Sequence, residues 1–93
     1  MNYRKRENIL WALTGSGIVI QNLDTNVFLI LNETQERVWA YIDGTNSMNQ
    51  LIEYIYKESD NISYEQASRI VEETVKILRV NSLIVGNNHD IVK

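Results

Sequence analysis

The chain has 93 residues, no cysteine, one histidine and a formal net charge of −3. This length fits one domain with one modest core, and we expect residues 1–93 to form it. The composition excludes disulfides, thiolate metal sites, cysteine nucleophiles and multi-histidine sites. We therefore expect no metal, no cofactor and no catalysis by these routes.

Charge and hydropathy also argue against nucleic-acid and membrane partners. A nucleic-acid binder normally has a basic excess or a basic face, which this composition does not provide. The apolar run Ile9–Leu13 is shorter than the roughly 7–15 residues of a signal-peptide core. No run approaches the roughly 20 apolar residues of a membrane span, so the expected location is the cytoplasm.

The first third of the chain has the composition of β-strands separated by turns. Three runs rich in β-branched and aromatic residues are Ile9–Thr14, Ile18–Asn22 and Val27–Leu31. The turn segments between them are Gly15–Gly17 and Asp24–Asn26. This pattern predicts a three-stranded antiparallel meander, preceded by a frayed basic terminus at Arg4, Lys5 and Arg6.

Three helix starts share one signature, a short polar residue followed three positions later by glutamine. They are Asn32 with Gln35, Ser47 with Gln50, and Ser63 with Gln66. The predicted helices run to about Ile42, Glu58 and Asn81, and the first stops at Asp43-Gly44.

A short hairpin is predicted at the end of the chain, with strands Leu83–Val85 and Asp90–Val92 around a turn at Gly86–Asn88. His89 would lie exposed in that turn. Strands, three helices and this hairpin give an α+β fold with a winged helix-turn-helix outline.

The predicted third helix is apolar on two adjoining faces. The core-facing stripe is Tyr64, Ala67, Val71, Val75 and Leu78, and the second line is Ile70, Thr74 and Ile77. Both lines could be buried in a small three-helix core. Alternatively, the second line forms one wall of a groove for a partner.

The predicted third strand is also apolar on both faces, since Val27, Leu29 and Leu31 alternate with Phe28 and Ile30. We therefore expect both faces to be covered. If the strand ends the meander, its edge carries neither charge nor proline and suits an added peptide strand. A central strand covered by the fold's own helices is the alternative.

Several short features together resemble a known family. They are Leu31-Asn32, Val38-Trp39, Asp43-Gly44, Ser47 with Leu51, and the series Val71, Val75, Leu78 and Leu83. In order and spacing, over about residues 9–85, they are similar to the PqqD-like RiPP recognition elements. Thr74 departs from the larger apolar residue common in that family, and Ser82 from its usual glycine.

The resemblance implies a peptide-binding protein that performs no chemistry. The leader segment of a ribosomally synthesised precursor would lie antiparallel to the third strand, between it and the third helix. Carried over by position, the strand wall is Val27, Phe28, Leu29 and Ile30, and the helix wall is Ile70, Thr74 and Ile77. The expected partner is a separate processing enzyme, favoured as the leader peptidase of a lasso-peptide pathway, with a radical-SAM enzyme as second choice.

Other interpretations stay open on the sequence alone. A winged helix could bind DNA, although Glu65, Glu72 and Glu73 offset Arg69, Lys76 and Arg79 on the exposed side of the third helix. A generic protein-interaction module, or a homodimer, could use the same open strand edge. Trp39 is assigned to the core, whereas the role of Trp11 stays open.

Overall fold

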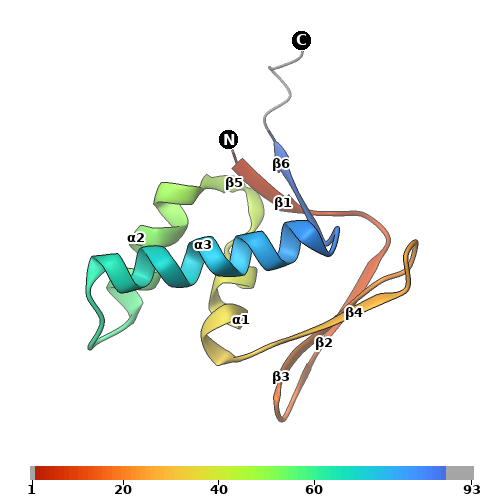
Figure 1. The fold of residues 1–93 in the computed structure, drawn as a ribbon, viewed down its shortest axis with the longest axis horizontal. Coiled ribbons are helices and arrows are strands. Elements are labelled where there is room, and N and C mark those ends of the chain that lie inside the picture. The colour runs from red at the N-terminus through yellow and green to blue at the C-terminus, as the bar shows by residue number, and fades with distance from the viewer. Residues whose placement is uncertain (1, 88–93) are drawn as a thin grey trace.

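The computed structural model describes residues 2–87 and shows three helices with two antiparallel three-stranded sheets (Figure 1), which confirms the α+β class. In chain order the elements are β1 (Asn2–Lys5), β2 (Ile9–Thr14), β3 (Gly17–Asn22), β4 (Val27–Leu31), α1 (Glu33–Ala40), β5 (Asp43–Ser47), α2 (Met48–Glu58), α3 (Tyr64–Val80) and β6 (Ile84–Asn87).

The predicted meander is confirmed as one sheet with the order β2-β3-β4. Gly15 and Ser16 make the two-residue turn between β2 and β3. Gly17 follows with a φ of 126°, and a Cβ there would overlap the Leu31 carbonyl oxygen, so only glycine fits. One face of β3 is buried, with Ile18 and Ile20 turned toward the core.

All three predicted helix starts are confirmed as capping boxes at Asn32, Ser47 and Ser63. Helix α3 ends in a Schellman arrangement, in which Leu83 N–H donates to Leu78 O at 2.9 Å and Ser82 N–H to Arg79 O at 3.0 Å. The residue at the left-handed position is Ser82, with a φ of 58°.

The second sheet, with the order β5-β1-β6, corrects three predictions. The N-terminal segment is not frayed, because Asn2–Lys5 pairs on both sides. Helix α1 ends at Ala40 with Tyr41 as its C-cap, and Asp43–Ser47 forms a strand. Strand β6 pairs with β1 rather than starting a terminal hairpin; the predicted second strand of that hairpin and His89 lie outside the described residues.

Lys5 connects this sheet to the end of α1. Its Nζ donates to the carbonyl oxygens of Trp39 at 2.9 Å and Ile42 at 2.8 Å, and lies 4.6 Å from the centroid of the Trp39 ring. Burial lowers the pKa of Lys5, and the nearby Asp43 carboxylate partly opposes this shift. The ammonium group thereby links β1 to the end of α1, where the Trp39 carbonyl also accepts from Ile42 N–H at 3.1 Å.

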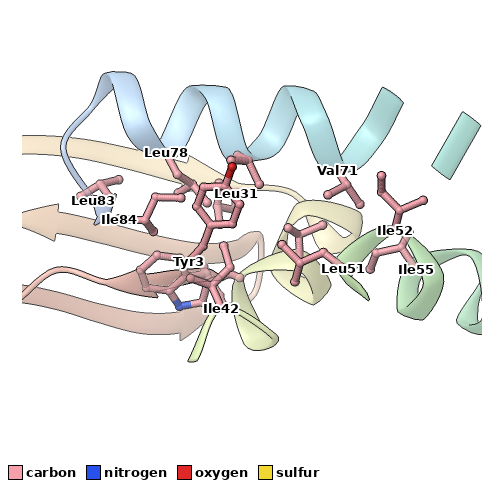
Figure 2. Packing of buried hydrophobic residues seen from close by; sticks show 14 of the residues in the cluster. Tyr3, Leu31, Ile42, Leu51, Ile52, Ile55, Val71, Leu78, Leu83 and Ile84 are labelled. Atoms are coloured by element: carbon pink, nitrogen blue, oxygen red, sulfur yellow. The ribbon is translucent and has the colours of Figure 1, made fainter. Parts of the chain in front are cut away.

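The core lies beneath α3, where Figure 2 shows Val71 and Leu78 directed toward Tyr3, Ile42 and Leu51. The predicted core residues of α3 are buried except for Tyr64, which lies in the first turn and contacts the Tyr56 ring instead. That part of the prediction is wrong because the first turn of α3 extends past the core.

Candidate functional site: an open strand edge beside helix α3

Strand β4 forms one edge of the meander, since β3 is its only neighbour in the sheet among residues 2–87. Its five residues include no charged residue and no proline. An edge strand presents unpaired main-chain groups, and proteins usually protect such an edge with charge, proline or a bulge. Of the two positions that the sequence left open for this strand, an edge or the centre of the sheet, β4 takes the edge, which carries neither charge nor proline.

The register shows which main-chain groups of β4 face that open edge. Thr14 and Gly17 close a two-residue turn, so they form a hydrogen-bonded pair. Odd-numbered residues of β3 therefore bond to β2, and its even-numbered residues bond to β4. Because those residues lie opposite Val27, Leu29 and Leu31, the odd-numbered residues of β4 are the ones that bond to β3. Phe28 and Ile30 consequently direct their N–H and C=O groups away from the sheet.

The side chains of β4 point alternately inward and outward. Val27 and Leu29 are half-buried on the inner face, where Leu29 packs against the core. Phe28 and Ile30 are 61% and 64% exposed on the outer face. The expectation that both faces are covered is wrong, because among the described residues the helices pack on the inner face only.

On the helix side, a hollow of about 230 Å³ lies between α3 and the start of α1. Ile70, Thr74 and Ile77 line it together, in agreement with the second apolar line on α3. The remaining lining residues are Asn32, Thr34, Gln35 and Glu73, none of which was predicted from the sequence to line a binding site. No residue of β4 lines this hollow; β4 ends at Leu31, directly before Asn32.

A second hollow of about 400 Å³ continues along α3 and shares Glu73 and Ile77 with the first. Lys76, Val80 and Asn81 complete its lining, and most of its surface is apolar. The two hollows make a shallow channel along one flank of the helix, with Ile77 between them.

Thr74 is nearly fully buried and its hydroxyl is already used. The Oγ1 donates to Ile70 O at 2.7 Å within the helix, so the hydroxyl has no unmet need for a partner. At this position the wall of the hollow is therefore a small side chain whose hydroxyl group is already hydrogen-bonded.

Asn22, which sequence reasoning missed, ties the β3–β4 turn to the end of α3. Its Oδ1 accepts from the N–H groups of Asp24 and Thr25, and its Nδ2 donates to Ser82 O at 2.7 Å. The side chain is buried, so these bonds satisfy it. This contact holds the β3–β4 turn against the segment that directly follows α3.

The outer face of the meander is apolar and uncovered by the part of the chain that the structure describes. A shallow surface hollow on it is lined by Leu10, Trp11, Ala12, Val19, Gln21 and Phe28. Within residues 2–87, no three histidine or acidic side chains gather to hold a metal ion, and no helix is long and apolar enough to cross a membrane.

No protein-family model and no curated protein matches this chain. Among solved structures, the fold is shared with proteins determined together with a leader peptide. One is described as lasso peptide synthetase B1 complexed with the leader peptide; the TM-score is 0.79 at 20% identity, covering 92% of this chain and 100% of that one. The other is TbiB1 in complex with the TbiA(beta) leader peptide, with a TM-score of 0.77 at 16% identity, covering 89% and 95%. At such identities the likeness establishes the shared fold.

Proposed function

We propose that this protein binds the leader segment of a ribosomally synthesised precursor peptide by adding it as a strand to the open edge of β4. The observation that carries the proposal is the unguarded, uncharged β4 edge beside the channel along α3. The shared fold with two proteins determined with leader peptides supports the same function.

The register defines how such a peptide is held. An antiparallel peptide would exchange main-chain hydrogen bonds with Phe28 and Ile30, the two residues whose groups face the open edge. The peptide residue opposite Leu29 would point to the inner face, toward the channel beside Ile70 and Ile77. Backbone pairing supplies affinity in this arrangement, and the channel selects the inward side chains.

The bound leader would be presented to a separate processing enzyme, and the protein itself would perform no chemistry. A leader peptidase of a lasso-peptide pathway is favoured, because both structural neighbours are described with leader peptides and one as a lasso peptide synthetase. A radical-SAM enzyme is the second choice. Holding the leader raises the effective concentration of the precursor at the enzyme, which we place in the cytoplasm.

A proline substitution in β4 tests the proposal. Ile30→Pro removes one edge-facing N–H without removing a bond to β3, so the fold is retained while peptide binding is lost. Ile30→Thr is the matched control, because it changes the exposed side chain and keeps the N–H. The probe is the fluorescently labelled leader segment of a precursor peptide encoded near this chain, followed by anisotropy.

The proposal predicts at least a tenfold weaker affinity for Ile30→Pro, equivalent to about 1.4 kcal/mol, and near-native affinity for Ile30→Thr. Circular dichroism should show that both variants are folded. Unchanged binding by folded Ile30→Pro would show that the leader does not pair with this edge.

A further inference from the structure

In the part of the chain that the structure describes, the meander has a second open edge at β2, the strand opposite β4 in the sheet. Its sequence, Ile-Leu-Trp-Ala-Leu-Thr, contains neither charge nor proline. Leu10, Trp11 and Leu13 are 58%, 50% and 67% exposed, so apolar side chains protrude from both faces of the strand. Strand β2 is therefore less protected than β4, whose inward side chains are half-buried.

The main-chain groups at this edge follow from the same register. Thr14 and Gly17 are a hydrogen-bonded pair, and Leu23 N–H donates to Asn8 O at 2.8 Å beyond the other end of the strand. Even-numbered residues of β2 thus bond to β3. The odd-numbered residues Ile9, Trp11 and Leu13 direct their N–H and C=O groups outward.

We propose that two copies of this chain associate by antiparallel pairing of their β2 strands about a two-fold axis at Trp11. In this register Ile9 of one copy faces Leu13 of the other, Leu10 faces Ala12, and Trp11 faces its own counterpart. The three outward-facing residues of each strand meet those of the other, which allows about six main-chain hydrogen bonds between the copies. Every cross-strand pair is apolar.

We infer a second copy as the partner because strand β2 is complementary to itself in this register. The register centred on Trp11 uses the whole run Ile9–Leu13, whereas a shift by two residues in either direction shortens the overlap. In a two-fold contact each residue pair occurs twice and both β2 edges are used, so no further strand can add at that edge. Trp11 is already oriented for it: its ring packs edge-on against Trp39, with centroids 6.0 Å apart, and its other side is exposed.

The association leaves β4 at the outer edge of each half of a six-stranded sheet, with the order β4-β3-β2-β2-β3-β4. It is therefore independent of leader binding and compatible with it. A five-residue strand pair is smaller than the about 1,200–2,000 Å² of a standard interface, so we expect a weak dimer with a dissociation constant between about 10 μM and about 1 mM.

Sedimentation equilibrium on the whole chain, at concentrations up to about 1 mM, tests the proposal. The wild type should approach twice the monomer mass as concentration rises, and Leu13→Pro, which removes an outward-facing N–H, should remain monomeric. Leu13→Lys serves as the second variant in case the proline prevents folding. Ile30→Pro is the matched control on the other edge, and it should dimerise normally.

Hydrogen exchange identifies the edge involved. The amides of Ile9, Trp11 and Leu13 should become protected with increasing concentration, while those of Phe28 and Ile30 should not. A monomer at every concentration would overturn the proposal, as would a dimer broken by Ile30→Pro but not by the Leu13 variants. Leu13→Pro should still bind the leader probe, so a failure here is separable from a failure of the proposed function.

Discussion

Trp39 connects α1 to both sheets, through Trp11 of β2 and Lys5 of β1. It is fully buried on α1, packs against Trp11, and lies under the Lys5 ammonium group. The assignment of Trp39 to the core from the sequence is confirmed. Its Nε1 is buried without a hydrogen-bond partner among the described residues, which is a cost that the packing outweighs.

Replacing Trp39 therefore has different consequences for different substitutions. Trp39→Ala should lower the free energy of unfolding by about 3–5 kcal/mol, because it leaves a large cavity. Trp39→Phe should cost less, since it fills more of the space and removes the unpartnered N–H. Urea denaturation followed by circular dichroism measures both; an equal cost for the two variants would contradict this account of the site.

Ser82 occupies a left-handed position at the end of α3 that favours glycine. Serine at this position is thus a local cost, and the turn itself is formed. Ser82→Gly should raise the free energy of unfolding by up to about 1 kcal/mol, because relief of the left-handed strain exceeds the entropy cost of glycine. Asn81→Gly is the matched control, since Asn81 has a φ of −91° and should be destabilised by the same change.

Asp43 supplies a pH-dependent part of the stability. Hydrogen bonds from the hydroxyl and the N–H of Thr45 lower the pKa of Asp43 below its ordinary 3.8, and Lys5 adds to this shift. Between the lowered pKa of Asp43 in the folded protein and its ordinary pKa in the unfolded chain, the unfolded chain binds more protons than the folded protein. The contribution of Asp43 to the free energy of unfolding is therefore fully present above the unfolded pKa and is lost as the pH falls through the folded pKa. Asp43→Asn should flatten the acid side of the stability profile, measured by denaturation from about pH 5 to about pH 2. Glu65→Gln, which also removes an exposed carboxylate, is the control; an unchanged slope in Asp43→Asn would contradict the assignment.

At the scale of elements, local signals in the sequence predicted the meander and the helices well. Each helix start carries its own capping residues, and the strands Ile9–Thr14 and Val27–Leu31 carry their own apolar pattern. Strands β1 and β5 lack such a pattern. The polar segment Asp43–Ser47 becomes a strand only by pairing with Asn2–Lys5, a contact between distant residues that no local propensity indicates.

For the channel, the sequence predicted only the lining residues contributed by α3. The periodicity of α3 brings Ile70, Thr74 and Ile77 together, as predicted, whereas Asn32 and Gln35 line the hollow because their capping box places the start of α1 there. The direction of the Phe28 and Ile30 side chains was correct from strand alternation. Their exposure was not predicted, because the helices cover only the opposite face of the sheet.

Ile77 separates the two hollows and is partly exposed, so it should contribute more to peptide binding than to stability. Ile77→Asp should weaken leader binding at least tenfold, or about 1.4 kcal/mol, while the protein stays folded. Tyr56→Asp, an apolar-to-acidic change on the exposed side of α2, should bind as the wild type does. An unfolded Ile77→Asp would show that the second apolar line of α3 belongs to the core.

At the scale of the molecule, the described residues leave the meander open at both edges, and the helices cover one of its faces. Asn22 holds one end of β4 close to the end of α3, and the capping box at Asn32 fixes the start of α1 at the other. A peptide strand added to β4 would complete the inner layer without moving either contact. We therefore expect binding with little change in the backbone of the protein.

The most direct test is an NMR titration of the isotope-labelled protein with the leader segment of a precursor peptide encoded nearby, followed by amide hydrogen exchange of the complex. We expect protection of the Phe28 and Ile30 amides, with chemical-shift changes confined to β4 and the Ile70–Ile77 flank of α3. Absence of these changes with every nearby leader, together with shifts on the exposed charged face of α3 upon adding duplex DNA, would contradict leader binding and favour a DNA-binding winged helix.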